Sequence, residues 1–97
     1  MLTSKQRAAL RGMASGYETI FQIGKGGITD AFVAQVADAL RARELIKLLV
    51  LENSGMTARE AAEQLAAATG SEVVQVIGSR FVLFLQNSKK PVIVLPR

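Results

Sequence analysis

The sequence predicts a two-layer α/β fold, in which three helices pack against a four-stranded mixed sheet. Apolar residues recur at helical spacing and in short strand-like runs, in the order helix, strand, helix, strand, helix, strand, strand. Two helices lie between successive strands, as right-handed β-α-β crossovers require, and a hairpin joins the last two strands. The 97 residues are enough for one modest core, so we expect residues 1–97 to form a single domain.

The first helix and the first strand have local sequence signals. Thr3-Ser4-Lys5-Gln6 has the pattern of a capping box, which predicts a helix from Ser4 to Ala14. Ser15-Gly16 ends this helix. Side chains from Tyr17 to Ile23 alternate in the manner of a strand.

The second helix and the second strand supply much of the expected core. Thr29 is placed to cap a helix that continues to about Ala42, with apolar side chains at helical spacing. Leu45 to Leu51 is an almost continuous apolar run, which is typical of a central strand covered on both faces. Lys47 is the one charged residue in this run.

The third helix lies between two turn signals. Asn53-Ser54-Gly55 predicts a turn, and Thr57-Ala58-Arg59-Glu60 is a second capping box. The alanine-rich helix that follows should end at Gly70, because glycine readily adopts the left-handed conformation found just after helices.

A hairpin and a tail complete the chain. Val73 to Ile77 and Phe81 to Leu85 are predicted strands, and Gly78-Ser79 suits a two-residue type II′ turn between them. Gln86 to Lys90 is a polar loop, and Val92 to Leu95 is expected to form a short extended tail because prolines flank it.

The composition limits the available chemistry. The chain has no cysteine and no histidine, so a disulfide framework and the usual zinc or copper ligands are missing. Most of the acids fall on predicted outer helix faces, and the commonest general base is lacking. We therefore expect no catalytic residues, no metal site and no cofactor. No apolar run could span a bilayer and no signal region begins the chain, which predicts a cytoplasmic protein without membrane contact.

Charge is segregated along the chain. The net charge is +4, and residues 1–29 and 80–97 carry +3 and +4, whereas residues 30–79 carry −3. If the fold brings the two ends to one side, they form a basic face suited to nucleic-acid phosphates. Solubility alone would also account for some net charge.

Gly24-Lys25-Gly26-Gly27 stands between a predicted strand and a predicted helix. Such a loop can present bare backbone N–H groups, a helix N-terminus and a cation to phosphate. The glycines could also serve only to turn the chain. Gly24-x-Gly26-x-x-Thr29 imitates a dinucleotide fingerprint, but threonine replaces its third glycine and the chain is too short for the complete fold.

The glycine loop and several basic side chains together favour RNA. A G-x-x-G loop that clamps the nucleic-acid backbone is the device of KH domains. In this chain Lys25 adds a cation to the loop, and the phenylalanines and Tyr17 fit core positions rather than stacking positions. The candidate RNA-binding residues are Gly24, Lys25, Gly26, Gly27, Lys5, Arg7, Arg11, Lys47, Arg80, Lys89 and Lys90.

Several ordered segments resemble the YhbY family, the stand-alone bacterial form of the CRM (chloroplast RNA splicing and ribosome maturation) domain. They are Leu2-Thr3-Ser4-Lys5-Gln6-Arg7, Phe21-Gln22-Ile23-Gly24-Lys25-Gly26-Gly27, Arg43-Glu44-Leu45-Ile46-Lys47, Val74-Gln75-Val76-Ile77-Gly78, Val82-Leu83-Phe84 and Leu95-Pro96-Arg97. The resemblance implies an RNA-binding fold similar to the C-terminal domain of a translation initiation factor. It also implies a role with precursors of the large ribosomal subunit.

Two departures from the family pattern are visible. Leu48-Leu49 stands where a Val-Lys type alternation is common, and Phe84 stands where tyrosine is frequent. The first makes this strand less basic than its relatives and weakens the expectation of a direct RNA contact beside Lys47.

We therefore expect a monomeric, non-enzymatic protein that binds ribosomal RNA during large-subunit assembly. Two alternatives remain open at this stage. A small nucleotide-binding enzyme or regulator could use the same glycine loop for phosphate, and a protein-interaction module could act on the ribosome surface.

Overall fold

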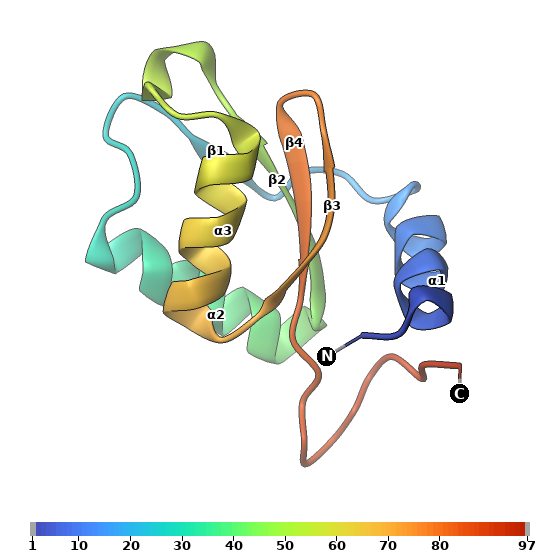
Figure 1. Ribbon diagram of the computed structural model, residues 1–97. Helices are drawn as coiled ribbons and strands as arrows, with labels where there is room; N and C mark the ends of the chain where they lie inside the picture. The colour runs from blue at the N-terminus through green and yellow to red at the C-terminus, as the bar shows by residue number, and fades with distance from the viewer. Residues whose placement is uncertain (1, 97) are drawn as a thin grey trace.

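The computed structural model describes residues 2–96 and confirms the predicted class and element order (Figure 1). Its helices and strands are α1 (Ser4–Ala14), β1 (Phe21–Ile23), α2 (Asp30–Arg43), β2 (Leu45–Val50), the 3₁₀ turn η1 (Glu52–Ser54), α3 (Ala58–Thr69), β3 (Glu72–Ile77) and β4 (Arg80–Phe84).

The strands form one mixed sheet in the order β1-β2-β4-β3. β1 and β2 are parallel, whereas β4 runs antiparallel to both of its neighbours. The last strand therefore lies between β2 and β3 and not at an edge. The expected central position of β2 is confirmed. The turn before β4 has Gly78 at φ 57° and Ser79 at negative φ, as a type II′ turn requires.

Helices cover both faces of the sheet, so the molecule has three layers instead of the two expected. α2 and α3 pack on one face, and α1 packs on the other (Figure 1). Successive β2 residues explain this arrangement: Ile46 and Leu48 enter the larger core under α2 and α3, whereas Leu45 enters the smaller core under α1. Because side chains alternate along a strand, a continuous apolar run needs cover on both sides.

The helix ends follow their local signals. Thr3 and Thr57 each form both hydrogen bonds of a capping box, with Gln6 and Glu60 as partners. Thr29 accepts the backbone N–H of Phe32 at 3.1 Å. Each such cap is worth about 1 kcal/mol of stability.

The first strand is shorter than predicted, because the segment from Tyr17 to Ile20 is pulled away from sheet pairing. The Tyr17 N–H donates to the Ala14 carbonyl at 2.9 Å, so this segment first continues the end of α1. It reaches β2 only where the Ile20 N–H donates to the Lys47 carbonyl at 2.9 Å.

Glu44 ties the C-terminal tail to the body of the molecule. It is fully buried and has φ 65°, which is unusual for a residue with a side chain. Its Oε2 accepts the Asn87 N–H at 2.6 Å, and its Oε1 accepts the N–H groups of Val92 and Ile93 at 2.8 and 2.6 Å. Glu44 follows the helix predicted to end at about Ala42, and no local signal in the sequence indicates that this acid is buried.

Candidate nucleic-acid interface

Gly24-Lys25-Gly26-Gly27 forms a tight turn beyond β1. The Gly27 N–H donates to the Gly24 carbonyl at 2.9 Å, which places Lys25 and Gly26 at the tip. Gly27 needs to be glycine because its φ is 68°. A Cβ on Gly26 would meet no atom within 4 Å, so packing does not require glycine there. The bare backbone at Gly26 instead leaves the tip open to close approach by a ligand.

Lys25 is exposed, and no ion pair to it occurs among residues 2–96. α2 begins only at Asp30, and that carboxylate lies in the first helical turn. A negative side chain in that turn opposes phosphate binding at the helix end. The turn and Lys25 therefore provide the attraction for an anion at this site, rather than the helix N-terminus.

A basic groove lies between α1 and the hairpin end of the sheet. It has a volume of about 290 Å³ and includes Arg11, Lys47 and Arg80. Arg80 pairs with Leu49 in β2 and is exposed, whereas Arg11 is half-buried. Its other lining residues are Ser15, Gln75, Ile77, Phe81 and Val82.

The glycine turn and the basic groove lie at the same end of the sheet. The β1–β2 pairing ends with Ile23 opposite Val50, and the Val50 N–H donates to the Ser79 carbonyl at 2.7 Å. Two strand spacings, roughly 10 Å, therefore separate the start of the glycine turn from the β3–β4 turn. A polymer could contact both, because its phosphates repeat at intervals shorter than this distance.

Lys47 has a structural role in this groove. Its ammonium donates to the carbonyls of Ala14 and Tyr17 at 3.1 and 3.3 Å. Lys47 thus satisfies backbone acceptors at the end of α1 and holds the next segment against β2. This contact explains the charge within an apolar strand.

Four other predicted contacts lie elsewhere. The Arg7 guanidinium donates to the Val73 carbonyl beside an irregularity in β3, and Lys5 lies in the first turn of α1. Lys89 and Lys90 follow Asn87, whose side chain accepts both of their backbone N–H groups. Lys89 and Lys90 lie beyond β4, at the end of the sheet where Leu45 pairs with Phe84. The length of β2 separates this end from the glycine turn by about 16 Å.

The fold therefore brings only some of the basic residues from the two ends of the chain onto one surface. The tail packs beside the start of α1, where the Gln6 side chain donates to the Pro96 carbonyl at 3.1 Å. The two chain ends thus meet, but at the end of the sheet opposite the glycine turn (Figure 1).

Tyr17 does not occupy the core position expected for it. Its side chain is 41% exposed, whereas Phe81 and Phe84 are buried and Phe21 stacks edge-on against Phe32. The strand-like alternation around Tyr17 gave the wrong prediction because this segment lies outside the sheet.

Residues 2–96 contain no group of three or more acidic side chains that could hold a metal ion. Within the same residues, no helix is both long and apolar enough to cross a membrane.

The fold and its cations define a small α/β domain with a basic surface at one end of its sheet. Comparison with known families identifies this domain. Residues 2–84 match the model of the CRS1 / YhbY (CRM) domain. The chain therefore belongs to the CRM domain family, as its sequence resemblance implied.

Similar proteins cover almost the whole chain. The "Probable RNA-binding protein YqeI" of Bacillus subtilis is 44% identical over 96 residues, which are 99% of this chain and 100% of that protein. An "RNA-binding protein" of Haemophilus influenzae is 31% identical over 99% of this chain and 96% of its own length. The solution structure of protein SAV1595 from Staphylococcus aureus has a TM-score of 0.77 and 44% identity, covering 99% of this chain and 100% of that chain.

Proposed function

We propose that this protein binds RNA without catalysing a reaction, and that its target is ribosomal RNA in precursors of the large subunit. The observation that carries the proposal is the exposed Gly24–Gly27 turn with Lys25 at its tip. The turn lies at the same end of the sheet as the basic groove. The relatives named as RNA-binding proteins and the family resemblance point to the same ligand class.

The structure narrows the set of contacts that we propose. The glycine turn, Arg80 and Arg11 form the RNA surface, and Lys47 supports it by holding the segment after α1. We assign only a long-range electrostatic contribution to Lys5, Arg7, Lys89 and Lys90. Charges at that range attract a polyanion at low salt and are screened beyond about 8 Å at physiological ionic strength.

Two charge reversals of equal size test the proposal. We expect Lys25→Glu to weaken binding to labelled ribosomal RNA fragments by about tenfold at low salt and to reduce the salt slope by about 1. Lys89→Glu makes the same change in net charge at the other end of the sheet, and we expect it to weaken binding only about twofold. Equal affinities for Lys25→Glu and the wild type would remove the glycine turn from the interface.

Further measurements separate the proposed function from the alternatives. Tight binding of mononucleotides in calorimetry, without affinity for RNA, would favour a nucleotide-binding enzyme or regulator. Ribosome association that survives nuclease treatment would favour a protein-interaction module. We propose that the protein acts as a monomer, which sedimentation with and without RNA would test.

A further inference from the structure

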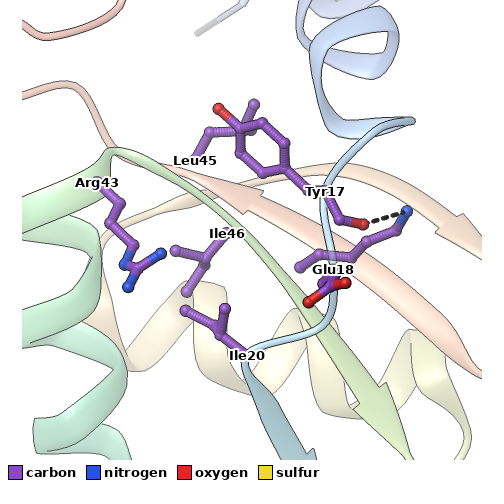
Figure 2. A pocket seen from close by; sticks show the side chains of 7 residues that line it. Tyr17, Glu18, Ile20, Arg43, Leu45 and Ile46 are labelled. Carbon is purple, nitrogen blue, oxygen red and sulfur yellow. Dashed lines mark hydrogen bonds between the residues drawn. The ribbon is translucent and has the colours of Figure 1, made fainter.

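A second hollow lies on the β1 side of β2 and shares only Lys47 with the basic groove. Its volume is about 360 Å³, at the lower end of the range for small-ligand pockets. Figure 2 shows it where the segment after α1 crosses the sheet edge. The pocket is lined by Tyr17, Glu18, Ile20, Arg43, Leu45, Ile46 and Lys47.

Tyr17 provides the aromatic wall of this pocket. Its backbone N–H is bonded to Ala14 and its carbonyl to Lys47, so the main chain beneath the ring is held from both sides. Tyr17 remains 41% exposed, and the neighbouring Ile20 is 37% exposed. An exposed ring on an ordered backbone can stack on a planar ligand without the cost of first ordering that backbone.

The start of β2 forms the buried floor of the pocket. Backbone groups of alternate β2 residues point to β4, as the bonds from Leu85 to Glu44 and from Val50 to Ser79 show. The intervening residues point to the β1 side, where the Lys47 carbonyl accepts Ile20. β1 pairs only with residues 48–50, and the start of β2 beyond this pairing is buried, because Leu45 and Ile46 are each 1% exposed.

Side chains of opposite charge lie at the two sides of the pocket. Arg43 and Glu18 are both exposed, and in Figure 2 they lie on opposite sides of Ile46 and Ile20. No ion pair joins Arg43 to any acid among residues 2–96. A phosphate is attracted to the Arg43 side, whereas the carboxylate of Glu18 can accept hydrogen bonds from amino groups of a base.

We propose that this pocket receives one unpaired nucleobase of the bound RNA. The base stacks on Tyr17, the exposed carboxylate of Glu18 accepts hydrogen bonds from its amino groups, and Arg43 contacts the adjoining phosphate. Proteins that recognise single-stranded RNA combine aromatic stacking with hydrogen bonds to base edges in this way. The inference rests on the proposed function, and it narrows the ligand to RNA with a single-stranded segment.

A protein strand added to the edge of β2 is the competing occupant. β1 leaves only residues 45–47 of β2 without a paired strand, and Leu45 and Ile46 there are each 1% exposed, whereas strands average five to six residues. Tyr17 is exposed, and Arg43 has no ion pair within residues 2–96, so both fit a nucleotide better than they fit a short peptide backbone.

Tyr17 provides its own probe, because the chain has one tyrosine and no tryptophan. Stacking on a base quenches tyrosine emission. We expect a short unstructured RNA to quench this fluorescence, and a duplex RNA of the same length to leave it unchanged. Tyr17→Ala should weaken binding of the unstructured RNA by about 5- to 100-fold, whereas Tyr17→Phe should stay within about twofold of the wild type.

Val94→Ala serves as the matched control, because Val94 is 88% exposed in the tail, and it should bind as the wild type does. Unchanged fluorescence on binding, or wild-type affinity in Tyr17→Ala, overturns the base pocket. If Lys25→Glu still loses affinity in that case, the proposed RNA-binding function stands. Loss of ribosomal-particle association in Tyr17→Ala, with its RNA affinity intact, would also overturn the base pocket and point to a protein strand.

Discussion

The two ends of the sheet differ in whether their polar groups are bonded within the protein or exposed to solvent. At the end where β2 begins, Glu44 is fully buried and satisfies three backbone N–H groups of the tail. At the other end, Lys25 and Gly26 stand exposed at the tip of a turn. Internal bonding closes the first end and fixes the tail, whereas the second end leaves its donors and its cation for a ligand. The difference separates residues that stabilise the fold from residues available for binding.

The largest expected effect is the loss of stability on removing the Glu44 carboxylate from the closed end of the sheet. Glu44→Ala removes the acceptor of three part-buried N–H groups and should lower the free energy of unfolding by about 3–5 kcal/mol, measured by urea denaturation. Glu44→Gln should lose about 1–3 kcal/mol, because its amide oxygen can still accept Val92 and Ile93 while its NH₂ group faces the Asn87 N–H. Equal losses in the two variants would show that the packing of this side chain, and not its hydrogen bonds, holds the tail.

A smaller effect separates stability from binding at the open end. Gly27→Ala places a side chain at φ 68° and should lower the free energy of unfolding by about 1 kcal/mol. Gly26→Ala meets no neighbour and should leave stability within about 0.5 kcal/mol of the wild type, while weakening RNA binding several-fold by blocking close approach to the backbone. Denaturation and RNA titration of both variants measure the two effects. Unchanged RNA affinity in Gly26→Ala would mean that RNA does not approach the backbone of Gly26 closely.

The smallest expected effect is on the pH dependence of stability, and it comes from the exposed carboxylate of Glu60, which accepts a backbone hydrogen bond. The backbone N–H of Thr57, and then its hydroxyl, lower the pKa of Glu60 below its ordinary value. A lowered folded-state pKa means that ionised Glu60 adds stability above its unfolded pKa, near pH 4.3, and that this stability is lost as the pH falls through the folded pKa. Between pH 5 and pH 3, unfolding of the wild type should therefore show a slightly larger loss of stability than unfolding of Glu60→Gln. Equal pH dependence in the wild type and Glu60→Gln would mean that solvent screening of the exposed carboxylate cancels the stabilising effect of its hydrogen bonds.

Local signals predicted most of the secondary structure. The helix caps at Thr3, Thr29 and Thr57 depend on residues within four positions, so a short stretch of sequence contains both partners. The strand predicted from Tyr17 failed in its first half, because the contact of Lys47 with Tyr17 spans 30 positions in the sequence. Periodicity carries no information about such a contact.

The candidate site was predictable in part. The glycines and Lys25 are contiguous, so their turn could be located from the sequence. Arg80, Arg11 and Lys47 meet only because β4 lies between β2 and β3 and α1 covers the opposite face from α2 and α3. The exposure of Tyr17 had no local signal.

By itself, the sequence determined the helix ends, the central apolar strand, the hairpin turn, the cationic glycine turn and membership of the CRM family. Each depends on neighbouring residues or on a linear pattern. The tertiary structure alone decided that Glu44 is buried, that Lys47 closes α1 against β2, and that the glycine turn lies far from Lys89. These outcomes depend on side chains and backbone groups up to 49 positions apart, which come together only when the sheet order is set.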